Sequence, residues 1–171
     1  MDARKESELS SKKDLTTVER KSERELVVTR TFNGPARIVF EAWTTPKLFR
    51  QWWVPKSLGM SLLSCEMDVR VGGRYRLEFA YGDSQAAFFG TYKEVTPHSR
   101  LVWTNEESDQ GSVTTVTFAE KGGKTLLVMH ELYPSKEALD AAGTGAADAM
   151  GETFEQLDEL LVTLGASEGW S

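Results

Sequence analysis

The sequence has little of what metal and redox sites require. It contains two histidines and one cysteine in 171 residues, too few for a typical zinc site and without an HxxxH or CxxC pair. Cys65 has no partner for an intramolecular disulfide, and a single thiol fits a reducing compartment. Glycine-rich phosphate loops and GxSxG motifs are also missing. We therefore expect no metal, no cofactor and no catalytic residue of these kinds.

Long apolar segments and an excess of basic residues are absent as well. No apolar run approaches the length needed to cross a bilayer, and the N-terminus has no stretch typical of a signal peptide. The net charge of −6 disfavours a nucleic-acid surface, which needs clustered Lys and Arg. These absences predict a cytoplasmic protein with neither a membrane nor a nucleic acid as its partner.

The N-terminal segment differs in composition from the rest of the chain. Acidic and basic side chains are balanced over its length, and apolar residues are few. Such a segment has too little apolar surface to build a core. We predict a mobile charged tail at residues 1–24, one domain at residues 25–166 and a C-terminal tail at residues 167–171. Deleting the first tail is expected to change the melting temperature by no more than a few degrees.

Regular secondary structure begins after the tail. ELVVTRTF (25–32) is rich in β-branched residues, which predicts a strand. Pro35 is suited to the first position of a helix, and ARIVFEAWT has apolar residues at helical spacing. Thr45-Pro46 repeats this start signal for PKLFRQWW. Two short helices are therefore expected after the first strand.

Six further strands are predicted, with short links between them. They are SLLSCEMDV, RYRLEFAY, AFFGTYKEV, RLVWT, SVTTVTFAE and TLLVMHEL. Short links join antiparallel neighbours, because parallel strands need long crossovers. Alternation places Leu63, Cys65, Met67 and Val69 on one face of the first of these strands, and Gly72-Gly73 predicts a tight turn after it.

The chain ends in helix. Ser135 can cap a short helix that Gly143 ends, and Thr144 can cap a longer one to about Leu164. Acidic residues between positions 148 and 159 form a stripe on the longer helix, which we interpret as a solvated face or, alternatively, an acidic docking surface. The opposite, apolar face consists of Met150, Phe154, Leu157, Leu160, Leu161 and Leu164.

This order of elements predicts an α+β helix-grip fold. A seven-strand antiparallel sheet would curve around the long C-terminal helix, with the two short helices between its outer strands. Because one helix cannot fill a curved sheet, we expect an apolar cavity that binds a small molecule. Strand parity and the helix face predict a lining of Tyr75, Leu77, Phe79, Tyr92, Trp103, Phe118, Met150 and Phe154.

His130 has two interpretations. Alternation with Leu126, Val128 and Leu132 places it on an otherwise apolar face. There it is a candidate ligand-binding residue, as a hydrogen-bond partner or a general base. The alternative is a structural histidine that is bonded to a cross-strand neighbour.

Charged residues within strands also have two interpretations. They are Arg30, Arg74, Arg76, Glu78 and Glu131. On the solvated side of the sheet they would pair across strands. A charge that faces the cavity instead would be costly without a partner and would orient a polar group of the ligand.

The motifs also resemble a known family. ELVVTRTFNGPARIVFEAWTTPKLFRQWW, DVRVGGRYRLEF, GTYKEVTPHSRLVWT and a last helix with LDELL are similar to bacterial relatives of the C-terminal domain of the activator of the ninety-kilodalton heat-shock-protein ATPase, in the START-like superfamily. The resemblance covers about residues 25–165, although Gly151-Glu152 stands where the family often has Gly-Trp. It implies a helix-grip fold and a deep pocket, but no particular substrate, because the superfamily includes lipid carriers, hormone receptors, cyclases and co-chaperone domains.

Three functions are compatible with the sequence. The first is non-catalytic binding of a small hydrophobic or aromatic molecule. The second, implied by the resemblance alone, is a protein-interaction module with a chaperone as its partner. The third is an enzyme of the cyclase or hydrolase type, which needs an acid and a base that converge in the pocket.

Overall fold

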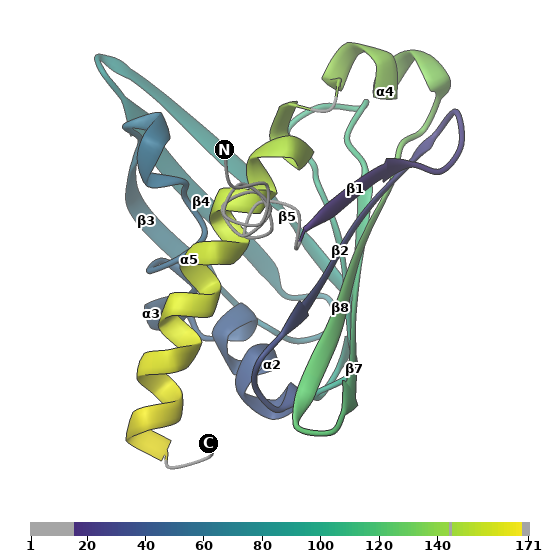
Figure 1. Cartoon of the computed structure of the whole chain (residues 1–171). Coiled ribbons are helices and arrows are strands. Elements are labelled where there is room, and N and C mark those ends of the chain that lie inside the picture. Colours follow the sequence, from purple (N-terminus) through teal and green to yellow (C-terminus); the bar gives the residue numbers. More distant parts are fainter. Residues whose placement is uncertain (1–15, 144, 169–171) are drawn as a thin grey trace, which may run out of the picture.

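The computed structural model describes residues 16–143 and 145–168 and shows one antiparallel sheet wrapped around a long helix (Figure 1). Its strands are β1 (Thr17–Arg20), β2 (Glu25–Phe32), β3 (Ser61–Met67), β4 (Arg74–Tyr81), β5 (Ser84–Thr96), β6 (Arg100–Thr104), β7 (Val113–Lys121) and β8 (Lys124–Leu132). Its helices are α2 (Ala36–Thr44), α3 (Pro46–Phe49), the 3₁₀ helix η1 (Lys56–Leu58), α4 (Lys136–Ala142) and α5 (Gly145–Glu168). The predicted α+β helix-grip architecture is confirmed.

The sheet has eight strands in the order β1-β2-β8-β7-β6-β5-β4-β3, and the predicted number of seven is wrong. The additional strand is β1, which lies within the segment predicted as a mobile tail. It pairs antiparallel with β2 from Thr17↔Thr29 to Arg20↔Leu26. Arg20 also forms an ion pair with Asp140 at 2.7 Å. Four residues of mixed polarity carry no strand signal, and only the exposed edge of β2 specifies this pairing.

Deletion of residues 1–24 is therefore expected to lower the melting temperature by about 4–8 °C, corresponding to a loss of about 2 kcal/mol. The deletion removes β1 and the hydrogen bond of 2.9 Å from the buried Arg30 to Thr16 Oγ1. Differential scanning calorimetry of the truncated chain measures the change. Deletion of residues 1–15, which retains every residue of β1, is the matched control. A shift below 2 °C for the longer deletion would contradict this expectation.

Helices α2 and α3 lie between the two ends of the curved sheet. Helix α2 contacts β7, β8 and α5, whereas α3 contacts β3. Trp43 and Trp52 are fully buried there, and Trp52 Nε1 donates a hydrogen bond of 3.0 Å to the carbonyl of Ala42. Trp52, Phe154 and Phe118, which packs edge-on against Phe40 at 5.4 Å, belong to the solid part of the core, and Trp43 lies at its boundary with the cavity.

Helix α5 crosses the concave face of the sheet and contacts β1, β2 and α2 (Figure 1). Gln156 Nε2 donates to the carbonyls of Trp52 and Val54, both at 2.9 Å. Glu152, which the acidic stripe predicted to be solvated, accepts hydrogen bonds from the backbone N–H and the hydroxyl of Ser57. Two polar residues of α5 therefore hold the segment 52–58 in place.

The ends of α4 and α5 agree closely with the sequence patterns. The Ser135 side chain caps α4 by accepting a hydrogen bond of 3.0 Å from the Ala138 N–H. Gly143 follows α4 with a φ of 68°, a conformation that favours glycine. The cap predicted at residue 144 lies outside the described residues, and α5 continues to Glu168, past the expected domain end at residue 166. No helix within 16–143 or 145–168 is long and apolar enough to cross a membrane.

Strand β3 departs from simple alternation. Its pairing with β4 shifts between Leu62 and Ser64, which turns Leu63 outward so that it is 48% exposed. Cys65 and Met67 stay on the inner face, packed against the core. The prediction that all three residues share one face was wrong, because a β-bulge reverses the side-chain parity at this point.

Candidate ligand-binding cavity

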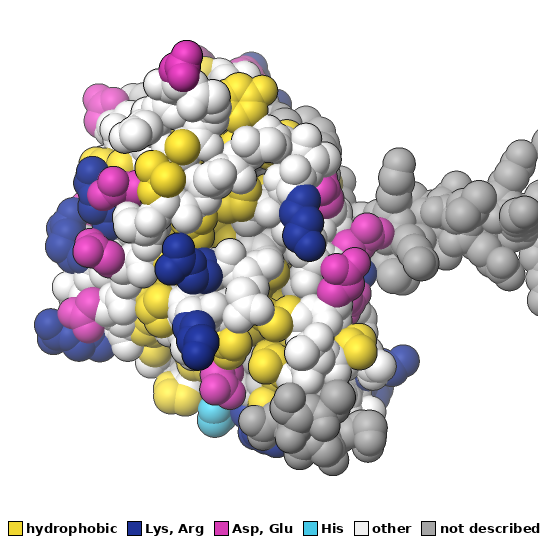
Figure 2. Space-filling model, turned by 90° about the vertical axis from the view of Figure 1, so that its left-hand side faces the viewer, with side chains coloured by type: hydrophobic (Ala, Val, Ile, Leu, Met, Phe, Trp, Pro, Cys, Tyr) yellow, Lys and Arg dark blue, Asp and Glu magenta, His cyan; other side chains and the backbone are white. Residues whose placement is uncertain are grey.

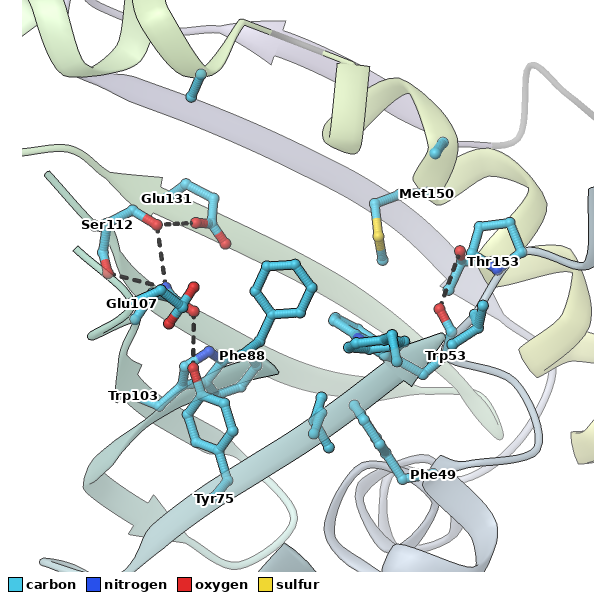
Figure 3. A pocket seen from close by; sticks show the side chains of 18 of the residues that line it. Phe49, Trp53, Tyr75, Phe88, Trp103, Glu107, Ser112, Glu131, Met150 and Thr153 are labelled. Carbon is cyan, nitrogen blue, oxygen red and sulfur yellow. Dashed lines mark hydrogen bonds between the residues drawn. The ribbon is translucent and has the colours of Figure 1, made fainter. Parts of the chain in front are cut away.

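A cavity of about 560 Å³ lies between the N-terminal half of α5 and strands β3 to β6. This volume is within the usual range of small-molecule sites. Most of its lining is apolar or aromatic, and polar side chains gather at one end, opposite Met150 and Trp53 (Figure 3). The sheet curves away from α5 here, whereas farther along the helix Phe154, Leu157 and Leu161 fill the same space.

Six of the nine predicted ligand-binding residues line this cavity. They are Tyr75, Leu77, Phe79, Tyr92, Trp103 and Met150. Phe118 and Phe154 do not line it, because their rings are buried in the solid core. Phe154 packs edge-on against Phe32 at 5.3 Å, and Phe118 lies 6.2 Å from Trp43, also edge-on. Sequence parity identified the correct faces but not the depth at which the cavity ends.

His130 lies on the opposite face of the sheet, and its prediction as a cavity residue was wrong. Its Nε2 is 2.6 Å from Glu25 Oε2, a carboxylate on the adjacent strand β2. This hydrogen bond is the largest of the effects that lower the pKa of Glu25. The structural interpretation of His130 is therefore correct. Apolar residues occur on both faces of β8, so alternation alone assigned the wrong face.

The cavity also contains aromatic residues that the prediction omitted. They are Trp43, Phe49, Trp53, Phe88 and Tyr133. Three of them come from α2, α3 and the following turn, and these elements have no strand parity that relates them to the sheet. Phe88 lies on β5 directly opposite Leu77 of β4. The alternation of side chains along β5 could therefore have identified it as a cavity residue.

The polar end of the cavity is a chain of hydrogen bonds. The Tyr75 hydroxyl lies 2.9 Å from Asn105 Oδ1. Asn105 Nδ2 donates to Ser112 Oγ at 3.1 Å and to Thr114 Oγ1 at 2.9 Å. Both hydroxyls in turn donate to the Glu131 carboxylate, Thr114 at 2.7 Å. Ser112 and Thr114 therefore meet at the Glu131 carboxylate, and Asn105 connects them to Tyr75 of β4.

Gly90 makes this arrangement possible. It lies opposite Tyr75 in the β4–β5 pairing, and a Cβ atom at position 90 would lie 1.7 Å from the Thr104 carbonyl oxygen and 2.8 Å from the Tyr75 ring. Only glycine allows strands and ring to approach so closely. The Tyr75 hydroxyl can therefore reach across β5 to the polar end.

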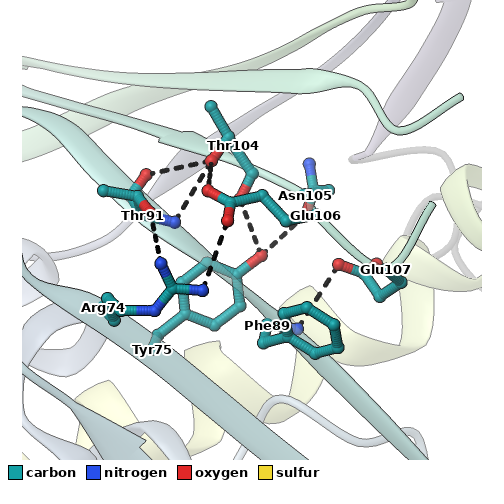
Figure 4. Close-up of polar contacts among 8 residues, drawn as sticks. All are labelled: Arg74, Tyr75, Phe89, Thr91, Thr104, Asn105, Glu106 and Glu107. Carbon is teal, nitrogen blue, oxygen red and sulfur yellow. Dashed lines mark hydrogen bonds and ion pairs between the residues drawn. The ribbon is translucent and has the colours of Figure 1, made fainter. Parts of the chain in front are cut away.

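The 105–112 connection is held by contacts on the outer side of the sheet (Figure 4). Glu106 accepts a hydrogen bond from Thr104 Oγ1 and pairs with Arg74 Nη2 at 3.3 Å. The hydrogen bond from Thr104 is the first of the effects that lower the pKa of Glu106. Glu107 Oε2 accepts a hydrogen bond of 3.3 Å from the Phe89 N–H. These contacts position Asn105 toward the cavity while Glu106 stays outside.

Glu131 lies in a different environment from Glu106. Burial is the main effect and raises its pKa, whereas the hydrogen bonds from Ser112 and Thr114 and the charge of His130 lower it. The negative charge of Glu107 raises the pKa further. The side chain retains accessible surface because it forms part of the cavity wall. A carboxyl group in this position favours its protonated, neutral form or a nearby positive charge that compensates its own.

Glu131→Gln is expected to change how stability depends on pH. A raised pKa in the folded state means that Glu131 stabilises the fold below its ordinary value of 4.5. This contribution is lost as the pH rises through the raised value. The variant should therefore gain stability relative to the wild type with increasing pH across this window, measured by urea unfolding. His130, Tyr75, Tyr133 and Glu107 are present in both proteins, and a pH-independent difference would contradict the expectation.

The cavity meets solvent where members of its lining are exposed. These residues are Leu58, Phe88, Glu107, Gln110 and Ala142. They come from η1, β5, the 105–112 connection and the end of α4. On the side of β3 and η1, hydrophobic side chains lie at the surface between charged ones (Figure 2).

Comparisons with known proteins agree with this architecture. The family model for Activator of Hsp90 ATPase homolog 1-like protein matches residues 33–162. A crystal structure from Rhodobacter sphaeroides is 24% identical with a TM-score of 0.78, covering 87% of this chain and 99% of that one. One from Nitrosomonas europaea is 23% identical with a TM-score of 0.77, covering 85% and 99%. No curated protein matches the chain in sequence. The structural likeness at this identity shows a shared fold.

Proposed function

This chain belongs to the family of Activator of Hsp90 ATPase homolog 1-like proteins, and from this premise we propose that its cavity binds one small hydrophobic or aromatic molecule without catalysis. The family suggests a ligand-binding or co-chaperone-type domain. The observation that favours ligand binding is the cavity itself, which is large, mostly apolar and has a few polar groups at one end. This combination is typical of sites that orient a small molecule.

The composition of the lining supports binding rather than chemistry. Among the described residues, those that line the cavity include no histidine, cysteine, lysine or arginine. Glu131 is next to Tyr133, whose pKa burial raises, and burial raises the pKa of Tyr75 even more. Phenols that resist ionisation are poor general bases near neutral pH. We therefore assign Glu131 a binding role in this proposal, rather than that of one member of an acid–base pair.

Nile red, a neutral apolar dye, provides a direct test of the proposed function. We expect its fluorescence to rise on binding the folded protein with one site per chain. At one hundred times its dissociation constant, the dye should raise the free energy of unfolding by about 2.7 kcal/mol, which corresponds to about 5–11 °C in melting temperature. Fluorescence titration and calorimetry measure these two effects.

Variants on α5 locate the dye. Ala149 lines the cavity, so Ala149→Trp should fill the space and abolish dye binding. Val162 is 71% exposed on the same helix, and Val162→Trp is the matched control that should bind as the wild type does. His130→Ala should also leave binding unchanged, because His130 lies on the outer face. Equal binding by both tryptophan variants would place the dye elsewhere and contradict the proposal.

A further inference from the structure

Glu131 is the acid on the inner face of β8, where it follows two apolar side chains. On β8, alternate side chains point toward the interior, and the two inner neighbours of Glu131 on this strand are the buried Leu127 and Met129. The carboxylate has no ion-pair partner among residues 16–143 and 145–168. A buried carboxylate without a cation is costly, so its retention here needs a compensating group.

The direction of the hydrogen bonds indicates which kind of ligand group the Glu131 carboxylate can still bind. Asn105 donates to Ser112 and Thr114, and their hydroxyls donate onward to Glu131. Both hydrogen bonds that reach Glu131 are therefore donated to its carboxylate. An ionised carboxylate accepts about four hydrogen bonds, and the two hydroxyls occupy about half of this capacity. The remaining capacity at the cavity wall requires a donor.

The charge of the cavity favours a cationic donor. The charged residues of the described lining are Glu107 and Glu131, both acidic. Charge-assisted hydrogen bonds to a carboxylate are roughly twice as strong as neutral ones. A ligand carboxylate would instead place a third negative charge in an apolar space, where like charges repel strongly.

We propose that the occupant of the cavity is a hydrophobic amine, whose ammonium group donates hydrogen bonds to Glu131 while its apolar body lies against the aromatic walls. This inference rests on the proposed ligand-binding function and specifies the chemical class of the ligand. Glu131 lies at one end of the cavity, and Trp53 and Met150 lie at the other (Figure 3). Thr153 is also at that second end, but its hydroxyl donates to the Trp53 carbonyl, so the arrangement suits a molecule with a single polar terminus.

Three probes with the same phenylbutyl body separate the classes: 4-phenylbutylamine, 4-phenylbutan-1-ol and 4-phenylbutanoate. Displacement of Nile red at about pH 8, where the amine is protonated, measures each affinity. The amine should bind about tenfold or more tightly than the alcohol, and the carboxylate should bind most weakly. In Glu131→Gln the amine-to-alcohol ratio should fall close to one. Glu159→Gln, the same change at an exposed site on α5, should keep the wild-type ratio.

The pH dependence provides a test that needs no variant. Because the pKa of Glu131 is raised by burial, lowering the pH favours its protonated form and should reduce the amine-to-alcohol ratio of the wild type. The titratable groups around it are Tyr75, Tyr133 and Glu107 at the cavity, with His130 on the opposite face. Glu107 is exposed and should contribute less.

The outcomes distinguish this inference from the proposed function. Equal binding of amine and alcohol by the wild type, or an amine preference that survives in a folded Glu131→Gln, would overturn the amine assignment while ligand binding stands. Failure of Nile red and all three probes to bind would overturn the proposed function itself. Tightest binding of the carboxylate would also contradict the charge argument.

Discussion

Phe154→Ala is expected to lower the free energy of unfolding by about 3–5 kcal/mol. The ring is fully buried on α5, 5.3 Å from the Phe32 ring and 6.2 Å from that of Trp43. Its removal exposes no new polar group, so the cost consists of lost transfer free energy and of the void that remains. Rigid neighbours on both sides, β2 and α2, limit how far the site can collapse.

Urea unfolding of Phe154→Ala at neutral pH measures this loss. Val162→Ala is the matched control, because Val162 is 71% exposed on the same helix, and its effect should stay within about 0.5 kcal/mol. A loss below about 1 kcal/mol for Phe154→Ala would mean that the ring borders empty space. It would then belong to the ligand-binding cavity, as the sequence pattern predicted.

Asp158→Asn is expected to lower the free energy of unfolding by about 3 kcal/mol, because it leaves a buried guanidinium without its counter-charge. Arg30, for which the sequence left both the solvated side and the interior open, is 3% exposed on the inner face of β2. Its Nη2 pairs with Asp158 of α5, and its Nη1 donates to Thr16. Burial raises the pKa of Asp158, and the bond and charge of Arg30 lower it. The Asp158 side chain is 32% exposed. The expected loss of stability therefore lies at the low end of the range for breaking a buried ion pair.

A double substitution separates the two contributions to this pair. Replacing both charges, as Arg30→Met with Asp158→Leu, removes the desolvation cost along with the attraction. The double variant should therefore be within about 1 kcal/mol of the wild type or more stable. Glu159→Gln is the matched single control on the exposed side of α5, with an expected effect below about 0.5 kcal/mol. A double variant as unstable as Asp158→Asn would show that an orphaned charge is not the cause.

Some site residues could be predicted from the sequence because their elements alternate cleanly. Strand β4 alternates Tyr75, Leu77 and Phe79 with charged or small residues, so its inner face could be assigned without a structure. Strand β8 carries apolar residues on both faces. There the alternation assigned His130 to the cavity and left both sides open for Glu131, whereas the structure places His130 outside and Glu131 at the cavity.

Other errors arise because the deciding contacts lie outside the residue's own helix or strand. The strand β1 pairs with the open edge of β2, to which it is joined by the turn at residues 21–24. Arg30 is buried because helix α5 covers it. Its partner on that helix, Asp158, is more than one hundred residues away in the sequence. Asn105 and Ser112 belong to a polar connection whose composition resembles any surface loop. Their role at the cavity follows from outer contacts such as Glu106 with Arg74.

The sequence by itself determined the fold class, the order of the elements and most of the apolar lining, because side-chain periods of about 2 and 3.6 residues are local properties of strands and helices. Only the tertiary structure decided where the core ends and the cavity begins, which charges are buried, and that Glu131 faces the cavity. These features depend on what lies opposite each side chain. A residue's burial and hydrogen-bond partners are set by segments that meet only when the sheet has closed around α5.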